Sequence, residues 1–243
     1  MLYLQRYGQP PKLGREEQAL FVHATLEQMP TAYFTADSLN EDMVRSCSLL
    51  VGSVECYLKA LDMLGIPEIQ PDYYPDCLQS FLGRNVWEGT VLDVKQAVAR
   101  GETLFTKPRI HWKSFDGQIV KPGMEDNPLR DFSDDYPVWL SETVEFVSEF
   151  RCYVTNSKLI ACCQYSGEED AQPALNCIER AIRTLELQSV NLPASYSIDF
   201  GLTAGGETLL VELGDGFSVG LYRGLPKEEY FRFLKARWDQ LTK

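Results

Sequence analysis

A pair of glycines, Gly205-Gly206, lies between two segments of alternating apolar residues, and it constrains this chain more than any other sequence feature. The pattern predicts a β-hairpin with a two-residue loop, in which residue 204 faces residue 207. Continuing that register away from the loop brings Asp199 opposite Glu212. Directly facing residues have Cβ atoms about 4.5–5.5 Å apart on one side of the sheet. The hairpin therefore predicts two adjacent carboxylates.

These carboxylates need a compensating partner, because like charges that face each other across a ladder are destabilising. One interpretation is a bound divalent cation, since Mg²⁺ is commonly held by one or two carboxylates together with substrate phosphates. The other is an exposed acidic pair that is solvated or matched to a lysine. The register alone leaves both open. Strand alternation places the apolar residues of the first strand on the opposite, buried face: Tyr196, Ile198, Phe200 and Leu202.

The first 75 residues alternate short apolar segments with helical patterns, which predicts a small α/β domain. Ser53 is the expected N-cap of a helix that Gly65 and Pro67 terminate. The proline-rich segment 66–76 is the expected domain boundary. The expected strands are residues 2–4, 32–34 and 48–51, and the expected helices are residues 16–29 and 53–64.

Residues 76–243 are expected to form a second, larger domain of α+β type. Its first helix, residues 173–187, is amphipathic, and a last helix begins near Pro226, a favoured first-turn residue. The expected strands are residues 103–108, 117–122, 143–154, 158–165, 196–203 and 207–213.

Composition argues against several kinds of function and site. The chain has 23 Lys and Arg residues against 35 Asp and Glu residues, a formal net charge of -12, and such a surface repels nucleic-acid phosphates. The seven cysteines lack zinc-ligand spacing, so reduced, packed thiols are expected. No segment has the apolar length of a signal peptide or of a membrane span, and we expect a cytoplasmic protein.

Six motifs occur in a specific order and spacing along the chain: LGRNVW (82–87), FTKP (105–108), HWKSFDG (111–117), SETVEFVSEFRCYV (141–154), SIDFG (197–201) and VELGDGFSVGLY (211–222). Together they resemble the motifs of the ATP-grasp family, in particular its compact clade named for two arginines and a lysine, and the similarity spans roughly residue 48 to residue 224. The resemblance implies an α/β (α+β) fold in which two β-sheet subdomains clasp ATP. Residues 76–243 would form the two subdomains, after an N-terminal domain of residues 1–75, with a hinge near 141–145.

The resemblance implies phosphate contacts for the lysine of FTKP. Lys107 would contact the α and β phosphates of ATP, and the loop 110–117, which carries Lys113, would close over the triphosphate. That loop contains a single glycine, Gly117, so it is not a glycine-rich phosphate cradle. The alternative for Lys107 is a solvated lysine at a strand end.

The segment 141–145 would be the hinge between the two ATP-binding sheets. The resemblance implies that Glu142 accepts a hydrogen bond from the adenine amine, through its side chain or its backbone, and that Val144 pairs with the ring edge. Glu149 would bind the ribose hydroxyls. Arg84 and Arg151 would be the two arginines of the clade, and a planar guanidinium suits phosphate or acyl-phosphate contacts. A solvated Glu149–Arg151 surface pair is the alternative.

Asp199 and Glu212 fall where the family holds its metal carboxylates, which favours the cation interpretation of the hairpin. One departure concerns the residue two positions after Glu212. The family motif usually reads Glu-x-Asn, whereas this chain has Gly214 there. Asp215 or a water molecule could supply the missing oxygen ligand.

The resulting hypothesis is a Mg²⁺- and ATP-dependent ligase. A substrate carboxylate attacks the γ-phosphorus of ATP, and an amine displaces phosphate from the acyl phosphate, chemistry that needs mainly positioning and charge stabilisation. The carboxylate and amine substrates would be small molecules or peptides, with Ser218, Tyr222 and Arg223 near the acceptor. The alternatives are a non-catalytic ATP-binding module and an ATP-dependent enzyme acting on RNA ends, which the charge of -12 disfavours.

Overall fold

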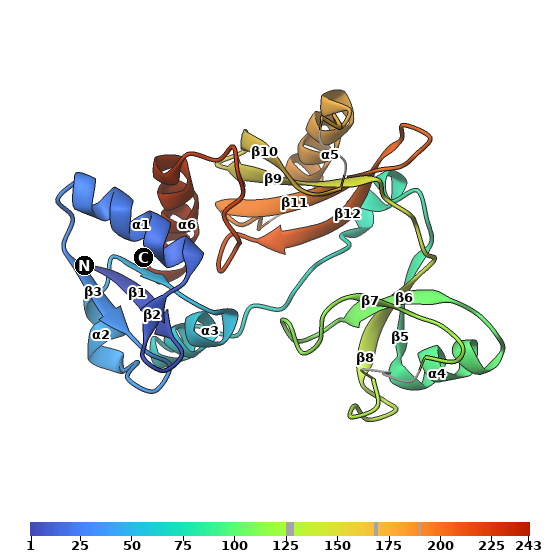
Figure 1. Cartoon of the computed structure of the whole chain (residues 1–243), viewed down its shortest axis with the longest axis horizontal. Coiled ribbons are helices and arrows are strands. Elements are labelled where there is room, and N and C mark those ends of the chain that lie inside the picture. The colour runs from blue at the N-terminus through green and yellow to red at the C-terminus, as the bar shows by residue number, and fades with distance from the viewer. Residues whose placement is uncertain (125–128, 168–169, 190) are drawn as a thin grey trace.

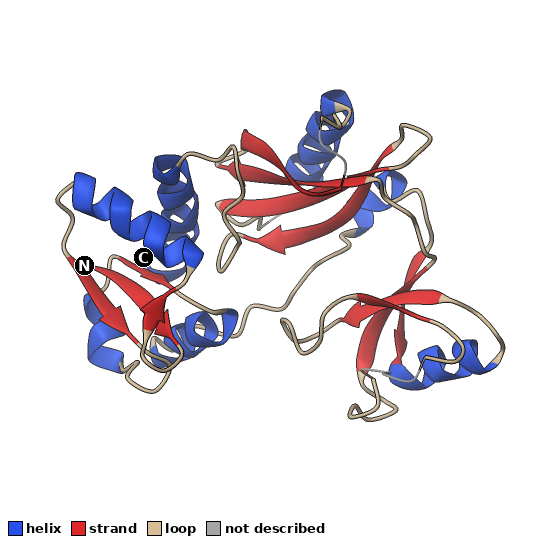
Figure 2. Cartoon of the chain, viewed as in Figure 1, coloured by secondary structure: helices blue, strands red, loops and turns tan. Residues whose placement is uncertain are grey.

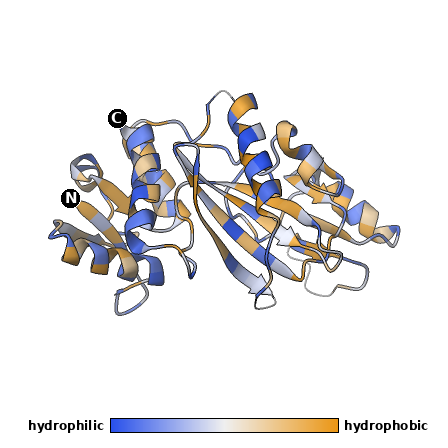
Figure 3. Ribbon diagram, turned by 90° about the horizontal axis from the view of Figure 1, so that it is seen from above, coloured by the Kyte–Doolittle hydropathy of each residue, from blue (hydrophilic) through white to orange (hydrophobic). Residues whose placement is uncertain are grey.

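The computed structural model describes residues 1–124, 129–167, 170–189 and 191–243, which form three four-stranded sheets (Figure 1). One sheet lies at the N-terminal end of the molecule, one at the opposite end, and the third between them along the long axis (Figures 1 and 2). Hydrophobic and hydrophilic residues alternate around the helices (Figure 3), as expected for helices that pack one face on a sheet. Within the described part of the chain, none of the helices combines the length and apolar character needed to cross a bilayer.

The N-terminal sheet has strand β1 in its centre, parallel to β3 and β4 and antiparallel to β2. Ser53 is the N-cap of α3, as predicted, because its hydroxyl accepts a 3.2 Å hydrogen bond from the Cys56 amide. The elements are β1 (Leu2–Tyr7), β2 (Lys12–Leu13), α1 (Arg15–Leu26), β3 (Thr31–Phe34), α2 (Glu41–Ser46), β4 (Leu49–Val51) and α3 (Val54–Met63).

The C-terminal helix α6 (Lys227–Thr242) completes the core of this N-terminal unit. Its buried residues Tyr230, Phe233 and Trp238 belong to the same hydrophobic cluster as Leu2 and Leu4 of β1. The first and last segments of the chain therefore share one core.

The central sheet is antiparallel, with the strand order β10-β9-β11-β12. Helix α5 (Leu175–Gln188) and the short helix η1 (Asp76–Phe81) pack together on one face, where Ile182 and Phe81 join the buried residues Ile198 and Phe200 of β11. The strands are β9 (Ser148–Thr155), β10 (Lys158–Gly167), β11 (Ser195–Leu202) and β12 (Thr208–Asp215).

The third sheet has the order β5-β8-β6-β7, and helix α4 (Val91–Ala99) covers it. Sequence analysis missed α4, although its N-terminus carries a capping box in which Thr90 and Asp93 each bond the other's backbone. The strands are β5 (Val86–Thr90), β6 (Leu104–Pro108), β7 (Gln118–Val120) and β8 (Pro137–Ser141).

A connection between two sheets replaces the first half of the strand expected at 143–154. Residues 142–147 leave β8 of the third sheet and enter β9 of the central sheet, so only the part from Ser148 onward is a strand. Phe146 packs in this connection against Gly201 of β11, where an added Cβ would lie 2.2 Å from the ring. The absence of a side chain at Gly201 thus makes room for the connection.

We predict that Gly201→Ala destabilises the protein by about 1–3 kcal/mol, because the new methyl group would push Phe146 out of its place. Urea unfolding measures this change. Gly205→Ala is the matched control, since the nearest atom to its Cβ is 3.7 Å away, and it should change stability by less than about 0.5 kcal/mol. Equal stability of the two variants would contradict the prediction.

Candidate functional site

Asp199 and Glu212 face each other as predicted, but by a different route through the hairpin. Thr203 pairs with Glu207, so the loop has three residues and the predicted two-residue loop is wrong. Between the pairs Asp199–Glu212 and Phe200–Leu210 the register shifts by one residue, and Val211 is the extra residue of a β-bulge. The bulge offsets the longer loop and restores the predicted pair.

Asp199 is held by an arginine on the neighbouring strand. The side chain of Arg151, directly opposite on β9, forms two hydrogen bonds with the carboxylate, Nε–Oδ1 at 2.9 Å and Nη2–Oδ2 at 2.6 Å. Asp199 is only 2% exposed. Burial raises the pKa of Asp199, and the Arg151 guanidinium opposes this rise. The carboxylate is therefore buried with a bidentate cationic partner.

Glu212 is paired with Lys107, which comes from the other ATP-clasping sheet of the expected fold. Lys107 lies on β6, is 5% exposed, and donates to Glu212 Oε2. Its ammonium also lies 3.2 Å from the centroid of the Tyr73 ring. Burial lowers the pKa of Lys107, whereas burial acts to raise the pKa of Glu212, which the adjacent ammonium holds below its ordinary value. Lys107 is thus not a solvated strand-end lysine, and its ion pair joins the two sheets.

The two facing carboxylates fit a Mg²⁺ ion that would take its other oxygen ligands from bound phosphates. The described residues contain no group of three or more His, Cys, Asp or Glu side chains placed to hold a metal by themselves. Two facing carboxylates are nevertheless a sufficient protein contribution when a nucleotide supplies further oxygens. Asp199 is buried and Glu212 is half-buried, so the two do not form an exposed, solvated pair. Each has a basic partner, and that of Glu212 is a lysine, as the alternative to a metal had allowed.

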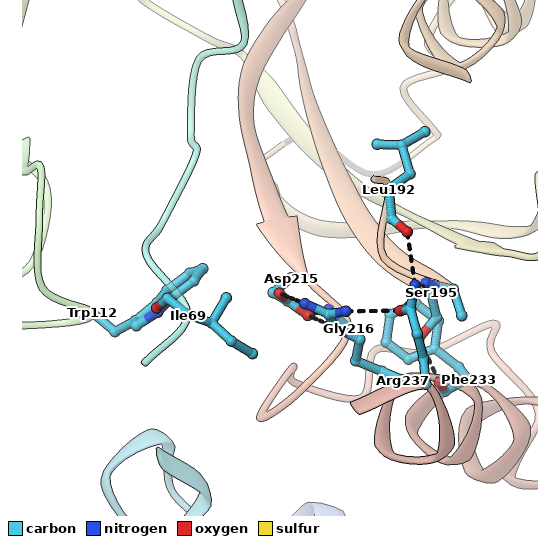
Figure 4. A network of polar contacts seen from close by, with 10 residues as sticks. Ile69, Trp112, Leu192, Ser195, Asp215, Gly216, Phe233 and Arg237 are labelled. Atoms are coloured by element: carbon cyan, nitrogen blue, oxygen red, sulfur yellow. Dashed lines mark hydrogen bonds and ion pairs between the residues drawn. The ribbon is translucent and has the colours of Figure 1, made fainter. Parts of the chain in front are cut away.

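The structure does not bring Asp215 together with this pair. Asp215 lies on the other side of β12 and accepts two 2.6 Å hydrogen bonds from Arg237 of α6 (Figure 4). Arg237 also donates to Gln240, whose amide bonds the Leu192 carbonyl. The position that was expected to replace a missing metal ligand is instead part of the contact between α6 and the central sheet.

A cavity of about 330 Å³ lies between the third sheet and the central sheet. It contains the residues expected to bind adenosine, Glu142, Val144 and Glu149, and Glu212 lies on its wall. The Glu142 carboxylate accepts hydrogen bonds from the backbone and side chain of Asn85, which lower its pKa. The remaining lining residues are Tyr74, Arg84, Phe105, Gly117, Gln118, Ile119, Ser141, Thr143, Phe146 and Val211.

Arg84 braces the wall of this cavity. Its guanidinium donates to the carbonyls of Leu82, Leu210 and Val211 and to the Ser141 hydroxyl, at 2.7–3.1 Å. Two of these carbonyls belong to Val211, the extra residue of the β-bulge, and to Leu210 just before it, so Arg84 fixes the irregular part of the hairpin. Sequence analysis assigned Arg84 to phosphate, and nothing in the sequence indicated that backbone carbonyls would occupy most of its donors.

Lys113 and the acceptor candidate Ser218 line a second, larger cavity of about 740 Å³. The indole of Trp112, beside Lys113, donates a 2.7 Å hydrogen bond to the Ile69 carbonyl and thereby holds the 110–117 loop against the inter-domain segment. The N-terminal unit contributes the acidic residues Glu16, Glu17 and Glu55, which the sequence did not single out. Tyr222 and Arg223 are not among the lining residues.

Comparisons with known proteins show the family and the fold of the chain. Residues 81–233, more than half of the chain, match the model of an ATP-grasp domain, family 2 of the clade named for two arginines and a lysine. No curated protein matches the chain.

Three solved structures of similar fold have 13% sequence identity each, which supports a conclusion on the fold alone. D-cycloserine synthetase DcsG has a TM-score of 0.59 with 99% of each chain covered. D-alanine–D-alanine ligase from Bacillus anthracis has a TM-score of 0.53, covering 98% of this chain and 95% of that chain. Macrocyclase MdnC, bound with precursor peptide MdnA from Microcystis aeruginosa MRC, has a TM-score of 0.51, covering 99% and 98%.

We predict that Asp215→Asn lowers stability by about 3–5 kcal/mol, because it leaves the buried Arg237 guanidinium without its charged partner. Denaturant unfolding measures this loss. Asp239→Asn, which affects more exposed pairs with Lys235 and Lys243, should cost less than about 1 kcal/mol. At a temperature where Asp215→Asn remains folded, its nucleotide binding should respond to Mg²⁺ as in the wild type. A lost response would place Asp215 at the metal.

Proposed function

The chain belongs to family 2 of the ATP-grasp clade named for two arginines and a lysine, and on this premise we propose that it is a ligase that activates a substrate carboxylate with ATP. The predicted fold, with two β-sheet subdomains after an N-terminal α/β unit, is confirmed. One observation carries the proposal: Lys107, Arg151, Asp199 and Glu212 converge where the two sheets meet beside a cavity.

In the proposed complex the adenosine occupies the cavity of about 330 Å³. The backbone of the 142–147 connection faces the adenine edge there, and Glu149, which now accepts a 2.7 Å hydrogen bond from Tyr165, is available to the ribose. Since the Glu142 carboxylate is bonded to Asn85, Glu142 would act on adenine through its backbone.

The phosphates would lie toward Lys107 and Arg151, and Asp199 and Glu212 would hold Mg²⁺. Bound Mg²⁺ would neutralise part of the negative charge of the phosphates. The ion pair between Lys107 and Glu212 would have to break when the metal nucleotide binds, because each side chain would need its charged group for a new partner. Lys107 would then donate to a phosphate oxygen, and Glu212 would be free to bind the metal.

The proposed chemistry has two steps. An oxygen of the substrate carboxylate attacks the γ-phosphorus, the bond to the β,γ-bridging oxygen breaks, and ADP leaves. An amine then attacks the acyl carbon of the acyl phosphate, and phosphate leaves as the amide forms and the amine loses its proton. The chain's own contribution is to orient the reactants and stabilise charge, so no protein nucleophile is required.

The cavity of about 740 Å³ is the proposed place of the substrates, since the 110–117 loop contributes to both cavities. Glu16 and Glu17 give its wall a negative charge, which suits a protonated amine. The similar structures carry the names of a D-cycloserine synthetase, a D-alanine–D-alanine ligase and a macrocyclase bound with a precursor peptide. Both a small amino compound and a peptide are therefore proposed as substrate classes, in a cytoplasmic setting.

A non-catalytic ATP-binding module is the second candidate, and Gly214 favours it. A Cβ at this position would lie 2.5 Å from the buried Ser197 hydroxyl oxygen, so the family's usual asparagine would displace Ser197. The site is thus built around two carboxylates without the amide ligand.

Nucleotide turnover separates the two candidates. The purified protein is incubated with Mg-ATP and a panel of amino acids and peptides, and ADP and AMP are quantified. ADP release that depends on a carboxylate compound supports the ligase. AMP release would overturn the acyl-phosphate step, and nucleotide affinity without any turnover would favour the non-catalytic module.

We predict that Lys107→Met reduces carboxylate-dependent ADP release by roughly 100-fold or more, because it removes a preorganised charge beside the phosphates. Steady-state kinetics of ADP formation measures this. Lys95→Met, which removes a surface ion pair with Asp134, is the control and should retain wild-type turnover. An active Lys107→Met variant would disprove the assigned role.

We also predict that Asp199→Asn/Glu212→Gln abolishes the response of nucleotide affinity to Mg²⁺, because it removes both proposed metal ligands. Calorimetric titration with ADP, with and without Mg²⁺, measures the response. The control is the double variant Asp37→Asn/Glu27→Gln, which alters two exposed residues and changes the net charge by the same amount. It should leave the response of nucleotide affinity to Mg²⁺ intact. A Mg²⁺ response that persists in the first variant would refute the site.

A further inference from the structure

Two cysteines face each other across the strands β9 and β10. Cys152 and Cys162 are direct partners in the antiparallel register, and their Sγ atoms are 3.0 Å apart. Facing residues of an antiparallel pair have Cα atoms about 4.5–5.5 Å apart, which lies within the range spanned by disulfides. Because a disulfide bond is about 2.05 Å long, roughly 1 Å of approach would bring these sulfurs to bonding distance.

Cys152 and Cys162 point to one face of the sheet, whereas the neighbouring thiol of Cys163 points to the other. Cys152 is fully buried in the cluster beneath α5, and Cys162 packs against the same cluster. Cys163, the next residue, belongs to the core on the opposite face of the sheet. Strand alternation therefore presents Cys162, and not Cys163, to Cys152.

We propose that Cys152 and Cys162 form a redox-active pair that closes to a disulfide by exchange with a low-molecular-weight disulfide such as oxidised glutathione. All seven cysteines are free thiols in the structure. In a reducing compartment such a bond is transient, since thiols reopen it. The inference does not depend on the proposed ligase activity.

The two thiols have different roles in the exchange. Cys162 is partly exposed, and the hydrogen bond that it accepts from Cys152 lowers its pKa, so it is the attacking thiolate. It attacks one sulfur of the reagent disulfide, which forms a mixed disulfide and releases one reagent thiolate. Cys152 then loses its proton and attacks the Cys162 sulfur, which releases the second thiolate. The protein loses two electrons and two protons, and the reagent disulfide gains them.

The bond would join an edge strand to the strand that carries the site. β10 is the outer strand of the central sheet, and β9 carries Arg151 immediately before Cys152. The register is irregular on both sides of the pair, between Leu159 and Ala161 and between Gln164 and Ser166. Oxidation would therefore fix a part of the sheet whose ladder is interrupted, and we expect the unfolding midpoint to rise by about 5 °C.

Peptide mapping tests the pair directly. The full-length protein is equilibrated with graded ratios of oxidised to reduced glutathione, free thiols are blocked, and tryptic peptides are identified by mass spectrometry. Cleavage after Arg151, Lys158 and Arg180 places Cys152 alone in peptide 152–158 and Cys162 in peptide 159–180. We expect these two peptides to be linked, with a loss of about 2 Da, the two thiol hydrogens, that reduction reverses. Complete blocking of both thiols at the most oxidising ratio would overturn the proposal, as would stable glutathione on Cys162 beside a blocked Cys152.

Matched variants identify the partner, because peptide 159–180 also contains Cys163 and Cys177. Cys163→Ser should retain the linked peptides, whereas Cys162→Ser should lose them. Persistence of the link in Cys162→Ser would assign the bond to another thiol and reject the proposed pair. Circular dichroism establishes that each variant is folded, and the unaltered protein gives the same answer through fragmentation of the linked peptides.

Discussion

The arrangement of the site depends on the neutralisation of two adjacent carboxylates. Asp199, which is buried, and Glu212, which is half-buried, face each other in a sheet, so water screens their repulsion only in part. Arg151 balances one from the adjacent strand, and Lys107 balances the other from a different sheet. Because a buried charge without a partner costs several kcal/mol, this requirement draws β6 toward β12. The electrostatics of a hairpin thus helps to determine how two subdomains meet.

The same balance gives the site its proposed capacity for a metal nucleotide. The two cationic and two anionic side chains together have no net charge. In the proposed complex, phosphate oxygens would replace the carboxylates as partners of Lys107 and Arg151, and Mg²⁺ would replace the two cations as the partner of the carboxylates. Tyr73 adds to this, since its ring lies against the Lys107 ammonium and gives it a favourable contact that carries no formal charge. Binding can therefore proceed by exchange of ionic partners, with no charge left buried alone.

The sequence predicted those parts of the structure that depend on local pattern. The three parallel strands of the N-terminal unit, the cap at Ser53 and the Asp199–Glu212 pair follow from periodicity and turn chemistry, whereas the short strand β2 was not predicted. The bulge at Val211 could not be predicted. It shifts the register by one residue, and the three-residue loop shifts it by one residue in the opposite sense, so the predicted Asp199–Glu212 pair was still correct. The ion pair of Asp215 with Arg237 joins segments 22 residues apart through the packing of α6, which no local pattern encodes. The bulge and the helix packing are decided by tertiary contacts.

The 110–117 loop connects the geometry of the two cavities. Gly117 lies on the wall of the smaller cavity, and an added Cβ there would lie 2.7 Å from the Phe105 ring, so the loop must approach β6 closely. Trp112 and Lys113 lie on the wall of the larger cavity, and the Trp112 indole is anchored at Ile69 between the domains. The loop is therefore held at two points, by the Trp112 indole at the Ile69 carbonyl and by the close approach of Gly117 to Phe105. In the proposed function, this one segment contributes to the walls of both the substrate cavity and the nucleotide cavity.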